Sequence, residues 1–326
     1  PHLNLPQVIH IAGTNGKGST LSYIKHILME HDLKVHTYTS PHLKNFEERI
    51  TIANKEVSTK KLLETLVYVK KINNEKPITF FEITTAAAFY LFAKKKADFL
   101  ILETGLGGRL DATNVIKNSF IDIITPIGID HQDFLGKKIT KITSEKLGII
   151  KKGSRVIVSK QKKYVMTDIK KKLKKFKNNI SFYDKDFKIL TRKKNTFILE
   201  LDKKKFKINN PFLIGSHQIE NAGTAVATIL TMNKLGHHFK IRKINKGLLN
   251  TVWPCRLEKF KFDKIDIYLD GSHNIDGAKK LLEYFQSNNL KIWLIIGMLN
   301  NKNIYSFLKI LKPILIGTVG ITIPKE

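Results

Sequence analysis

Two kinds of hydrophobic spacing alternate along the first part of the sequence. Short runs rich in β-branched residues predict buried strands over residues 7–12, 34–39, 99–103 and 121–127. Apolar residues spaced three and four apart predict helices over residues 19–31, 59–71, 80–94 and 138–150. Strands that alternate with helices are typical of an α/β domain with a largely parallel sheet, because each connection between parallel strands has to cross the sheet.

The alternation returns near the C-terminus, after a long predicted helix over residues 217–235 and a connector that contains Trp253 and Pro254. There we expect strands over residues 265–269, 291–296 and 314–319, separated by helices over residues 275–286 and 305–311. The sequence therefore predicts two domains, residues 1–251 and 258–326, of which the second is a smaller Rossmann-like α/β unit.

The composition is that of a folded globular protein. Of the 326 residues, 42% are apolar and 26% are charged, which allows a sizeable core. The single cysteine, Cys255, excludes an intramolecular disulfide and fits a reducing, cytoplasmic setting. No apolar run reaches the ~18 to 20 residues of a membrane-spanning helix, so we expect no membrane partner.

The formal net charge of +29 is the unusual feature of the composition. Such an excess favours nucleic acids, anionic membranes or phosphorylated substrates. Only six of the 57 basic residues are arginine, however, and nucleic-acid-binding proteins depend on arginine for bidentate contacts. We therefore attribute the charge to a biased composition and expect no nucleic-acid partner, with a nucleic-acid-binding P-loop ATPase as the alternative. Within the lysine-rich stretch 151–207 we expect a peripheral helix and a hairpin.

The strongest local motif is the glycine-rich run IHIAGTNGKGST at residues 9–20, which joins the first strand to the first helix. Glycines let backbone N–H groups converge on phosphate oxygens, and the helix N-terminus adds partial positive charge. Residue 11 is isoleucine where the common phosphate loop has glycine, so a flexible glycine turn is the alternative. We expect ATP to bind at Gly13, Thr14, Asn15, Gly16, Lys17, Gly18 and Ser19.

Three polar residues follow three of the other predicted strands. Ser40 follows the strand over 34–39, Glu103 ends the strand over 99–103, and His131 follows the strand over 121–127. Each alone is typical of a turn or a surface position. Ligands bind at the carboxyl ends of parallel strands, however, and magnesium prefers hard oxygen donors. The three residues therefore predict a nucleotide–metal site at the same sheet edge as Lys17.

Further motifs follow in a fixed order along the chain. They are SPHL at 40–43, TFFE at 79–82, ETGLGGRLDATN at 103–114, DH at 130–131, EKLGIIK at 145–151, GSHQ at 215–218, WP at 253–254, and Asp270 with HN at 273–274. With these motifs the sequence resembles the folylpolyglutamate synthase and dihydrofolate synthase family of the Mur ligase superfamily. The resemblance implies a P-loop-type ATPase domain with a largely parallel sheet, followed by the smaller Rossmann-like domain. Relative to the family pattern, we expect roughly the first forty residues and a C-terminal portion to lie outside this sequence.

The resemblance also implies an activity. The expected enzyme is an ATP-dependent amide ligase that adds L-glutamate to dihydropteroate or to a folate through an acyl phosphate. It implies ATP as co-substrate, Mg²⁺ at two sites, and a monomer whose partners are ATP, L-glutamate and the pterin or folate acceptor. A Mur ligase that adds an amino acid to a cell-wall precursor is the alternative within enzymes, since it shares the phosphate loop and the acyl phosphate.

The same resemblance assigns roles to individual residues. The metal ligands would be Ser40, Glu103, His131 and, once carbamylated, Lys146. The catalytic residues would be Lys17, Lys146 and His273, and the nucleotide would also meet Asn221, Arg256 and Asp270. The pterin or folate would bind at Thr79, Phe80, Phe81, Glu82 and Leu110. Two assignments have structural alternatives, because Lys146 could be a solvated helix lysine and one of the two phenylalanines could belong to the core.

Overall fold

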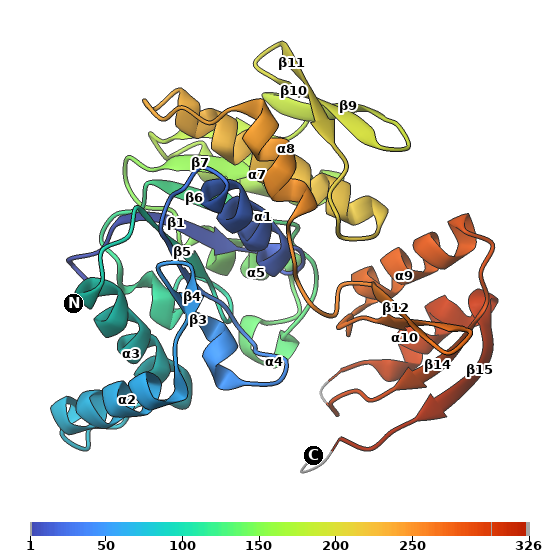
Figure 1. Cartoon of the computed structure of the whole chain (residues 1–326), viewed down its shortest axis with the longest axis horizontal. Coiled ribbons are helices and arrows are strands. Elements are labelled where there is room, and N and C mark those ends of the chain that lie inside the picture. The colour runs from blue at the N-terminus through green and yellow to red at the C-terminus, as the bar shows by residue number, and fades with distance from the viewer. Residues whose placement is uncertain (1, 301, 324–326) are drawn as a thin grey trace. The chain divides into compact units, whose positions relative to one another are not determined.

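The computed structural model describes residues 2–300 and 302–323 (Figure 1). The chain divides into two compact units. The first unit runs to Phe212 and includes Ile219–Trp253, and the second unit combines Leu213–Gln218 with the chain from Pro254 onward. The domain limits expected from the sequence, 1–251 and 258–326, stay a prediction.

An eight-stranded sheet forms the centre of the first unit, with strand order β4-β3-β2-β5-β1-β6-β7-β8. The six strands from β2 to β8 in this order are parallel, and β3 and β4 add an antiparallel edge. The predicted largely parallel sheet is therefore confirmed. The strands are β1 Gln7–Ala12, β2 Val35–Tyr38, β3 Ile50–Ile52, β4 Lys55–Glu56, β5 Phe99–Glu103, β6 Ile121–Ile124, β7 Arg155–Val158 and β8 Asn179–Phe182.

Helices cover both faces of this sheet (Figure 1). Two apolar clusters join one face to α3, α5 and α6, and α1 packs with α8 against the other. On β1, Val8, His10 and Ala12 point to the face of the two clusters, because side chains alternate along a strand. The helices of this part of the chain are α1 Lys17–Met29, α2 Thr59–Asn73, α3 Phe80–Lys94, α4 Gln132–Leu135, α5 Ile139–Leu147, α6 Lys163–Leu173, α7 Ser216–Asn233 and α8 Ile241–Leu249, with 3-10 turns η1 Phe46–Arg49 and η2 Ala112–Val115.

Most predicted elements agree with the structure to within a few residues. The strand expected over 121–127 ends earlier, at Ile124, because the chain turns there and Pro126 has no N–H to continue a ladder. The lysine-rich stretch contains the expected helix, α6, but also β7, β8 and a three-stranded sheet. That small sheet consists of β9 Phe187–Arg192, β10 Thr196–Leu201 and β11 Lys204–Asn209.

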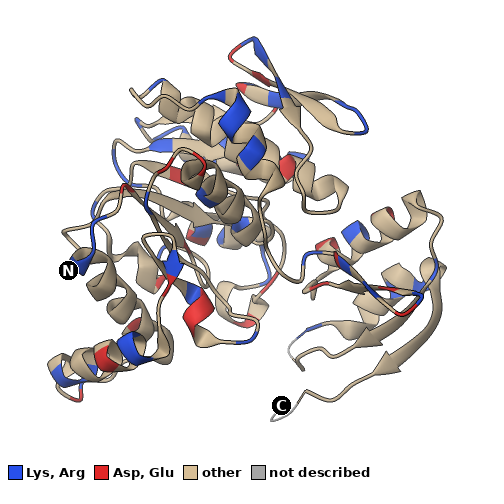
Figure 2. Cartoon of the chain, viewed as in Figure 1, with Lys and Arg blue, Asp and Glu red and all other residues tan. Residues whose placement is uncertain are grey.

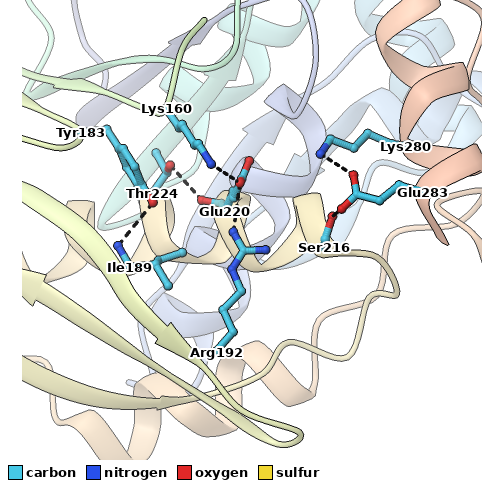
Figure 3. Close-up of polar contacts among 9 residues, drawn as sticks. All are labelled: Lys160, Tyr183, Ile189, Arg192, Ser216, Glu220, Thr224, Lys280 and Glu283. Atoms are coloured by element: carbon cyan, nitrogen blue, oxygen red, sulfur yellow. Dashed lines mark hydrogen bonds and ion pairs between the residues drawn. The ribbon is translucent and has the colours of Figure 1, made fainter. Parts of the chain in front are cut away.

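Ion pairs connect the small sheet to helix α7 (Figure 3). Glu220 accepts from Arg192 of β9 at 3.0 Å and from Lys160 at 2.9 Å, so one carboxylate joins two cations. Thr224 on the next turn donates to the carbonyl oxygen of Glu220 at 3.1 Å. These contacts fix the part of α7 that also carries Asn221, a residue expected at the nucleotide.

The second unit is a smaller α/β structure with two short sheets. Its strands are β12 Glu258–Phe262 and β13 Ile265–Leu269, which are antiparallel, and β14 Ile292–Ile296 and β15 Leu315–Gly320, which are parallel. Its helices are α9 Ile275–Ser287, α10 Ile304–Leu311 and the 3-10 turn η3 Lys312–Ile314. Leu257, Phe285, Phe307 and Leu311 form its buried core.

Two further features of the chain are the distribution of its basic residues and the length of its apolar helices. Figure 2 shows Lys and Arg distributed over many elements of the chain. Among residues 2–300 and 302–323, no helix is both long and apolar enough to cross a membrane.

Asp122 of β6 provides a test of stability against pH. Its buried carboxylate accepts from Ser154 Oγ at 2.6 Å and from the Lys151 N–H at 3.0 Å, and burial raises its pKa from an ordinary 3.8 to about 6. Because the folded-state pKa lies above the unfolded-state value, the folded protein binds the proton more tightly, and stability falls as pH rises from about 4 to about 7. We expect wild type to lose roughly 2 to 3 kcal/mol over this window relative to Asp122→Asn. Denaturant unfolding of both proteins at the two ends of the window measures this, and a pH-independent difference would contradict it.

Candidate functional site

The predicted phosphate loop lies between β1, which ends at Ala12, and α1, which begins at Lys17. Gly16 caps the helix with φ 80°, a left-handed conformation that glycine adopts without strain. A Cβ there would also lie 2.5 Å from Asn221 Oδ1. The cap has no side-chain hydrogen bond and the first turn has no acidic residue, so the N-terminus of α1 presents N–H groups and partial positive charge to a ligand.

The loop after β6 holds the phosphate loop in shape. Pro126 O accepts the backbone N–H of Thr14 at 2.9 Å and of Asn15 at 3.1 Å. The Thr14 hydroxyl donates to Gly128 O and accepts from Gly128 N, both at 3.0 Å. Because Pro126 and Gly128 contribute backbone atoms, the conformation of this loop sets the position of the nucleotide-binding turn.

Gln161 holds the supporting loop in turn, and its role was not apparent from the sequence. Its side-chain oxygen accepts the Ile127 N–H at 2.9 Å and its amide donates to Thr125 O at 3.1 Å. Both contacts are to main chain across more than thirty residues of separation. The local sequence around Gln161 is a lysine-rich segment, and it contains no pattern that predicts these contacts.

Lys17, Glu103 and Ser40 come together at the carboxyl ends of β1, β5 and β2. Lys17 Nζ lies 3.8 Å from Glu103 Oε1, and the Ser40 N–H donates to Glu103 Oε2 at 3.3 Å. The Glu103 side chain is only 5% exposed. Ser40 Oγ is buried and has no hydrogen-bond partner within the described part of the chain. A buried hydroxyl oxygen beside a buried carboxylate suits a hard cation such as Mg²⁺, which retains water and phosphate oxygens as its other ligands.

Lys146, near the end of α5, is buried rather than solvated. Its amine donates to Gly13 O at 2.8 Å, directly behind the phosphate loop. Burial, and secondarily the positive charge of Lys17, lowers the pKa of the Lys146 amine to about 7. A large share of this amine is therefore uncharged near neutral pH, which a surface lysine is not.

His131 lies in the loop that follows β6, at the same sheet edge. It precedes α4 with φ 50°, its imidazole is 40% exposed, and its Nε2 lies 4.0 Å from the Asp130 carboxylate. Among residues 2–300 and 302–323, no three or more His, Cys, Asp or Glu side chains are grouped to hold a metal ion. A metal here would therefore draw on Ser40 and on phosphate oxygens as well as on carboxylate and imidazole ligands.

Two residues from later in the chain also contact the phosphate loop. The side-chain oxygen of Asn221 on α7 lies so close to Gly16 that a Cβ at Gly16 would clash with it, and Asn221 was expected at the nucleotide. The indole ring of Trp253 lies against Gly18, where an added Cβ would come within 2.6 Å of the ring. Trp253 belongs to the WP motif of the sequence, but no binding or catalytic role was predicted for it.

Arg256, Asp270 and His273 belong to the second unit. There Asp270 accepts the N–H groups of Leu257 and Ser272, both at 2.8 Å, and so holds a turn together. Arg256 donates to Cys255 O at 3.0 Å, and His273 Nδ1 lies 3.0 Å from Gly271 O. Their parts in binding nucleotide or glutamate stay predictions.

A cavity of about 530 Å³ lies next to the segment expected to bind the pterin. It is lined by part of α3 and by the chain between β5 and the end of η2, and the lining residues are His2, Glu82, Thr85, Ala86, Phe89, Arg109, Leu110, Asp111, Ala112, Asn114 and Val115. Of the five residues expected at the pterin, Glu82 and Leu110 line this cavity.

The other three expected pterin residues have contacts of their own. Thr79 and Glu82 form a capping box at the start of α3, in which each side chain accepts from the backbone of the other. Phe81 is half-buried against the core and lies over Gly105, whereas Phe80 is 66% exposed. The expectation that one of the two rings packs in the core is therefore confirmed for Phe81.

The fold and this site define an ATP-binding ligase domain of the Mur type. Residues 11–229 match the family model described as the Mur ligase middle domain. The chain is 32% identical over 328 residues to the dihydrofolate synthase/folylpolyglutamate synthase of Bacillus subtilis, covering 94% of this chain and 74% of that one. It is 32% identical over 338 residues to the dihydrofolate synthetase of Saccharomyces cerevisiae, covering 96% and 77%.

A solved structure gives the same result. The E. coli FolC structure in complex with DHPP and ADP superposes with a TM-score of 0.88 at 27% identity, over 97% of this chain and 74% of that one. The chain therefore belongs to the folylpolyglutamate synthase/dihydrofolate synthase family. A cell-wall ligase would share the middle domain, but these relatives are folate enzymes.

Proposed function

We propose that this protein catalyses ATP-dependent ligation of L-glutamate to dihydropteroate, to a folate, or to both. The observation that carries the proposal is the position of one chain segment. Glu103 ends β5 beside Lys17 of the phosphate loop, and only a few residues later the same segment forms the wall of the 530 Å³ cavity. A nucleotide on the loop and an acceptor in the cavity would thus be held by neighbouring parts of one compact unit.

The reaction proceeds in two displacements. An oxygen of the acceptor carboxylate attacks the γ-phosphorus of ATP, the bond to the β-phosphate oxygen breaks, and ADP leaves. The amine of glutamate then attacks the acyl carbon, inorganic phosphate leaves, and the amine loses a proton. Phosphoryl transfer depends chiefly on positioning and charge neutralisation, which Lys17 and the N–H groups at the start of α1 supply.

Magnesium is part of the proposal. Ser40 and Glu103 fit a first Mg²⁺, with His131 at the same sheet edge. When bound, the ion neutralises phosphate charge. Lys146 would serve a second ion once its uncharged amine has combined with CO₂ to give a carbamate and a proton, because a carbamate is an anionic oxygen ligand.

The remaining assignments rest on the family resemblance. In this proposal Asn221, Arg256 and Asp270 bind the nucleotide, His273 meets the incoming glutamate, and Thr79, Phe80, Phe81, Glu82 and Leu110 surround the pterin. The partners are small molecules, the protein acts as a monomer, and its location is cytoplasmic.

The test is ADP release by the purified protein with ATP, Mg²⁺ and L-glutamate. Dihydropteroate, tetrahydrofolate and no acceptor are compared side by side. We expect turnover that requires both glutamate and an acceptor, and the ratio of the two rates ranks the two activities. Turnover that is independent of acceptor, or absent with both, would overturn the proposal.

A further inference from the structure

A chain of three buried polar side chains runs beneath the wall of the acceptor cavity. His10 Nε2 lies 2.9 Å from Thr113 Oγ1, and Thr113 Oγ1 lies 2.5 Å from Asp111 Oδ1. His10 and Thr113 are fully buried, and Asp111 is 8% exposed. The chain links the middle of β1, just before the phosphate loop, to a residue that lines the cavity.

The direction of the hydrogen bonds follows from their chemistry. Burial raises the pKa of Asp111, but both of its oxygens accept backbone N–H groups, which stabilises the ionised form. An ionised carboxylate only accepts, so the Thr113 hydroxyl donates to Asp111 and must accept from His10. His10 therefore carries its proton on Nε2, which leaves Nδ1 as a bare acceptor. Nδ1 indeed has no hydrogen-bond partner among the residues that the structure describes. Burial, and secondarily the charge of Lys151, lowers the pKa of His10 to about 3, so the ring stays neutral and this arrangement does not change near neutral pH.

Asp111 holds the loop that forms the cavity wall. Its Oδ2 accepts the Leu106 N–H at 2.9 Å, and its Oδ1 accepts the Thr113 N–H at 3.0 Å. The carboxylate thus joins the two ends of the turn that carries Arg109 and Leu110 into the cavity. The turn begins immediately after Glu103, so its conformation also affects the position of the Glu103 carboxylate, an expected metal ligand.

The surroundings of His10 show that the ring is not there for packing. Its neighbours on the same face of β1 are Val8 and Ala12, each part of an apolar cluster. An aliphatic residue would continue those clusters, whereas a histidine there carries an unpaired ring nitrogen, which is costly. Within residues 2–300 and 302–323, the single hydrogen bond of the ring is the one to Thr113.

We propose that His10 and Thr113 are positioning residues that hold the wall of the acceptor cavity in place through Asp111. The proposal rests on the function proposed above, because it takes the cavity to be the acceptor site. The substrate whose binding depends on the chain is therefore the pterin or folate acceptor, and the nucleotide depends on it much less.

Four variants separate the hydrogen bonds from the fold. His10→Leu and Thr113→Val remove the bonds, whereas His10→Gln keeps an N–H donor near the position of Nε2 and Thr113→Ser keeps the hydroxyl. We expect the first two to raise the KM for the acceptor about tenfold and the second two to stay within about threefold of wild type. The affinity for an ATP analogue should change by less than about twofold in all four.

His36 provides a matched control. It is as buried as His10 and lies on the neighbouring part of the same sheet, in β2. Its ring nitrogens contact Lys95 O at 2.9 Å and the Ala53 N–H at 3.0 Å, and none of these groups lines the cavity. His36→Leu should lower the stability of the protein without raising the KM for the acceptor.

Hydrogen exchange of the segment 104–115 gives a readout that needs no turnover. Exchange there should be faster in His10→Leu and Thr113→Val than in wild type, and unchanged in His36→Leu. If the wild type is inactive but the variants show this exchange pattern, the proposed function is overturned. The result would still support the hydrogen-bond chain as the contact that holds the loop in place. If the wild type is active but His10→Leu raises the KM for the acceptor no more than His36→Leu does, the positioning role is overturned.

Discussion

Replacement of Glu103 by glutamine is expected to lower turnover by about a hundredfold to a thousandfold, while the protein remains folded. The carboxylate is buried, with one oxygen 3.8 Å from Lys17 Nζ and the other 3.3 Å from the Ser40 N–H. A neutral amide is a poor ligand for Mg²⁺, and its NH₂ group would face other donors. ADP release at ordinary magnesium concentration measures the loss, and circular dichroism checks the fold.

Glu200→Gln is the control for this variant. Glu200 lies on β10, and its partly exposed carboxylate pairs with Lys188 at 3.4 Å, so its replacement makes the same change in charge at a residue that contacts none of Lys17, Ser40 and Glu103. Its turnover should equal that of wild type. Unchanged turnover in Glu103→Gln would contradict the proposed metal site. Loss of turnover in both variants would show that the effect is one of net charge.

Replacement of Lys17 by methionine is expected to have an effect of similar size. The amine is the only side-chain cation within the phosphate loop itself, residues 13–19, and it also faces the buried Glu103. Its loss removes charge neutralisation from the transferred phosphate and leaves the carboxylate without its cation, so turnover should fall about a thousandfold and binding of an ATP analogue should weaken. Initial rates and calorimetric titration measure the two effects.

Lys25→Met is the matched control for Lys17→Met. Lys25 lies on the same helix, is partly buried, and donates to Thr51 Oγ1 at 3.3 Å. Nucleotide binding and turnover should stay close to those of wild type. Equal losses in the two variants would mean that the helix, and not the amine at its start, determines the result.

The elements that position the site could largely be predicted, because each carries its own signal. β5 has a continuous apolar run and β1 has an apolar run interrupted by His10. Helix α3 begins with a capping box whose Thr79 and Glu82 stand three residues apart. The glycine-rich turn between β1 and α1 depends on Gly16, whose left-handed conformation few other residues adopt. These features are local, so the sequence contains them directly.

Contacts between distant parts of the chain could not be predicted in the same way. The family motif marks Lys146, but no local hydrophobic or charge pattern distinguishes it from a solvated lysine, and only the fold shows its amine against Gly13 O. The Gln161 contacts to the loop after β6 and the bond between His10 and Thr113 are likewise tertiary. Helix α8 was not among the predicted elements: it is only nine residues long, contains Gly247 in its interior and lacks a side-chain cap at its start.

The segment from Glu103 to Val115 has a consequence for inhibitors. It supplies a carboxylate beside Lys17 of the phosphate loop and a wall of the 530 Å³ cavity, so one short stretch of backbone contributes to both places. Any coupling between a compound in the cavity and a compound at the phosphate loop is reciprocal, because linkage requires each to alter the affinity of the other by the same factor. Compounds directed at the cavity should accordingly be tested in pairs with compounds directed at the phosphate loop, and each pair should be judged by its joint effect.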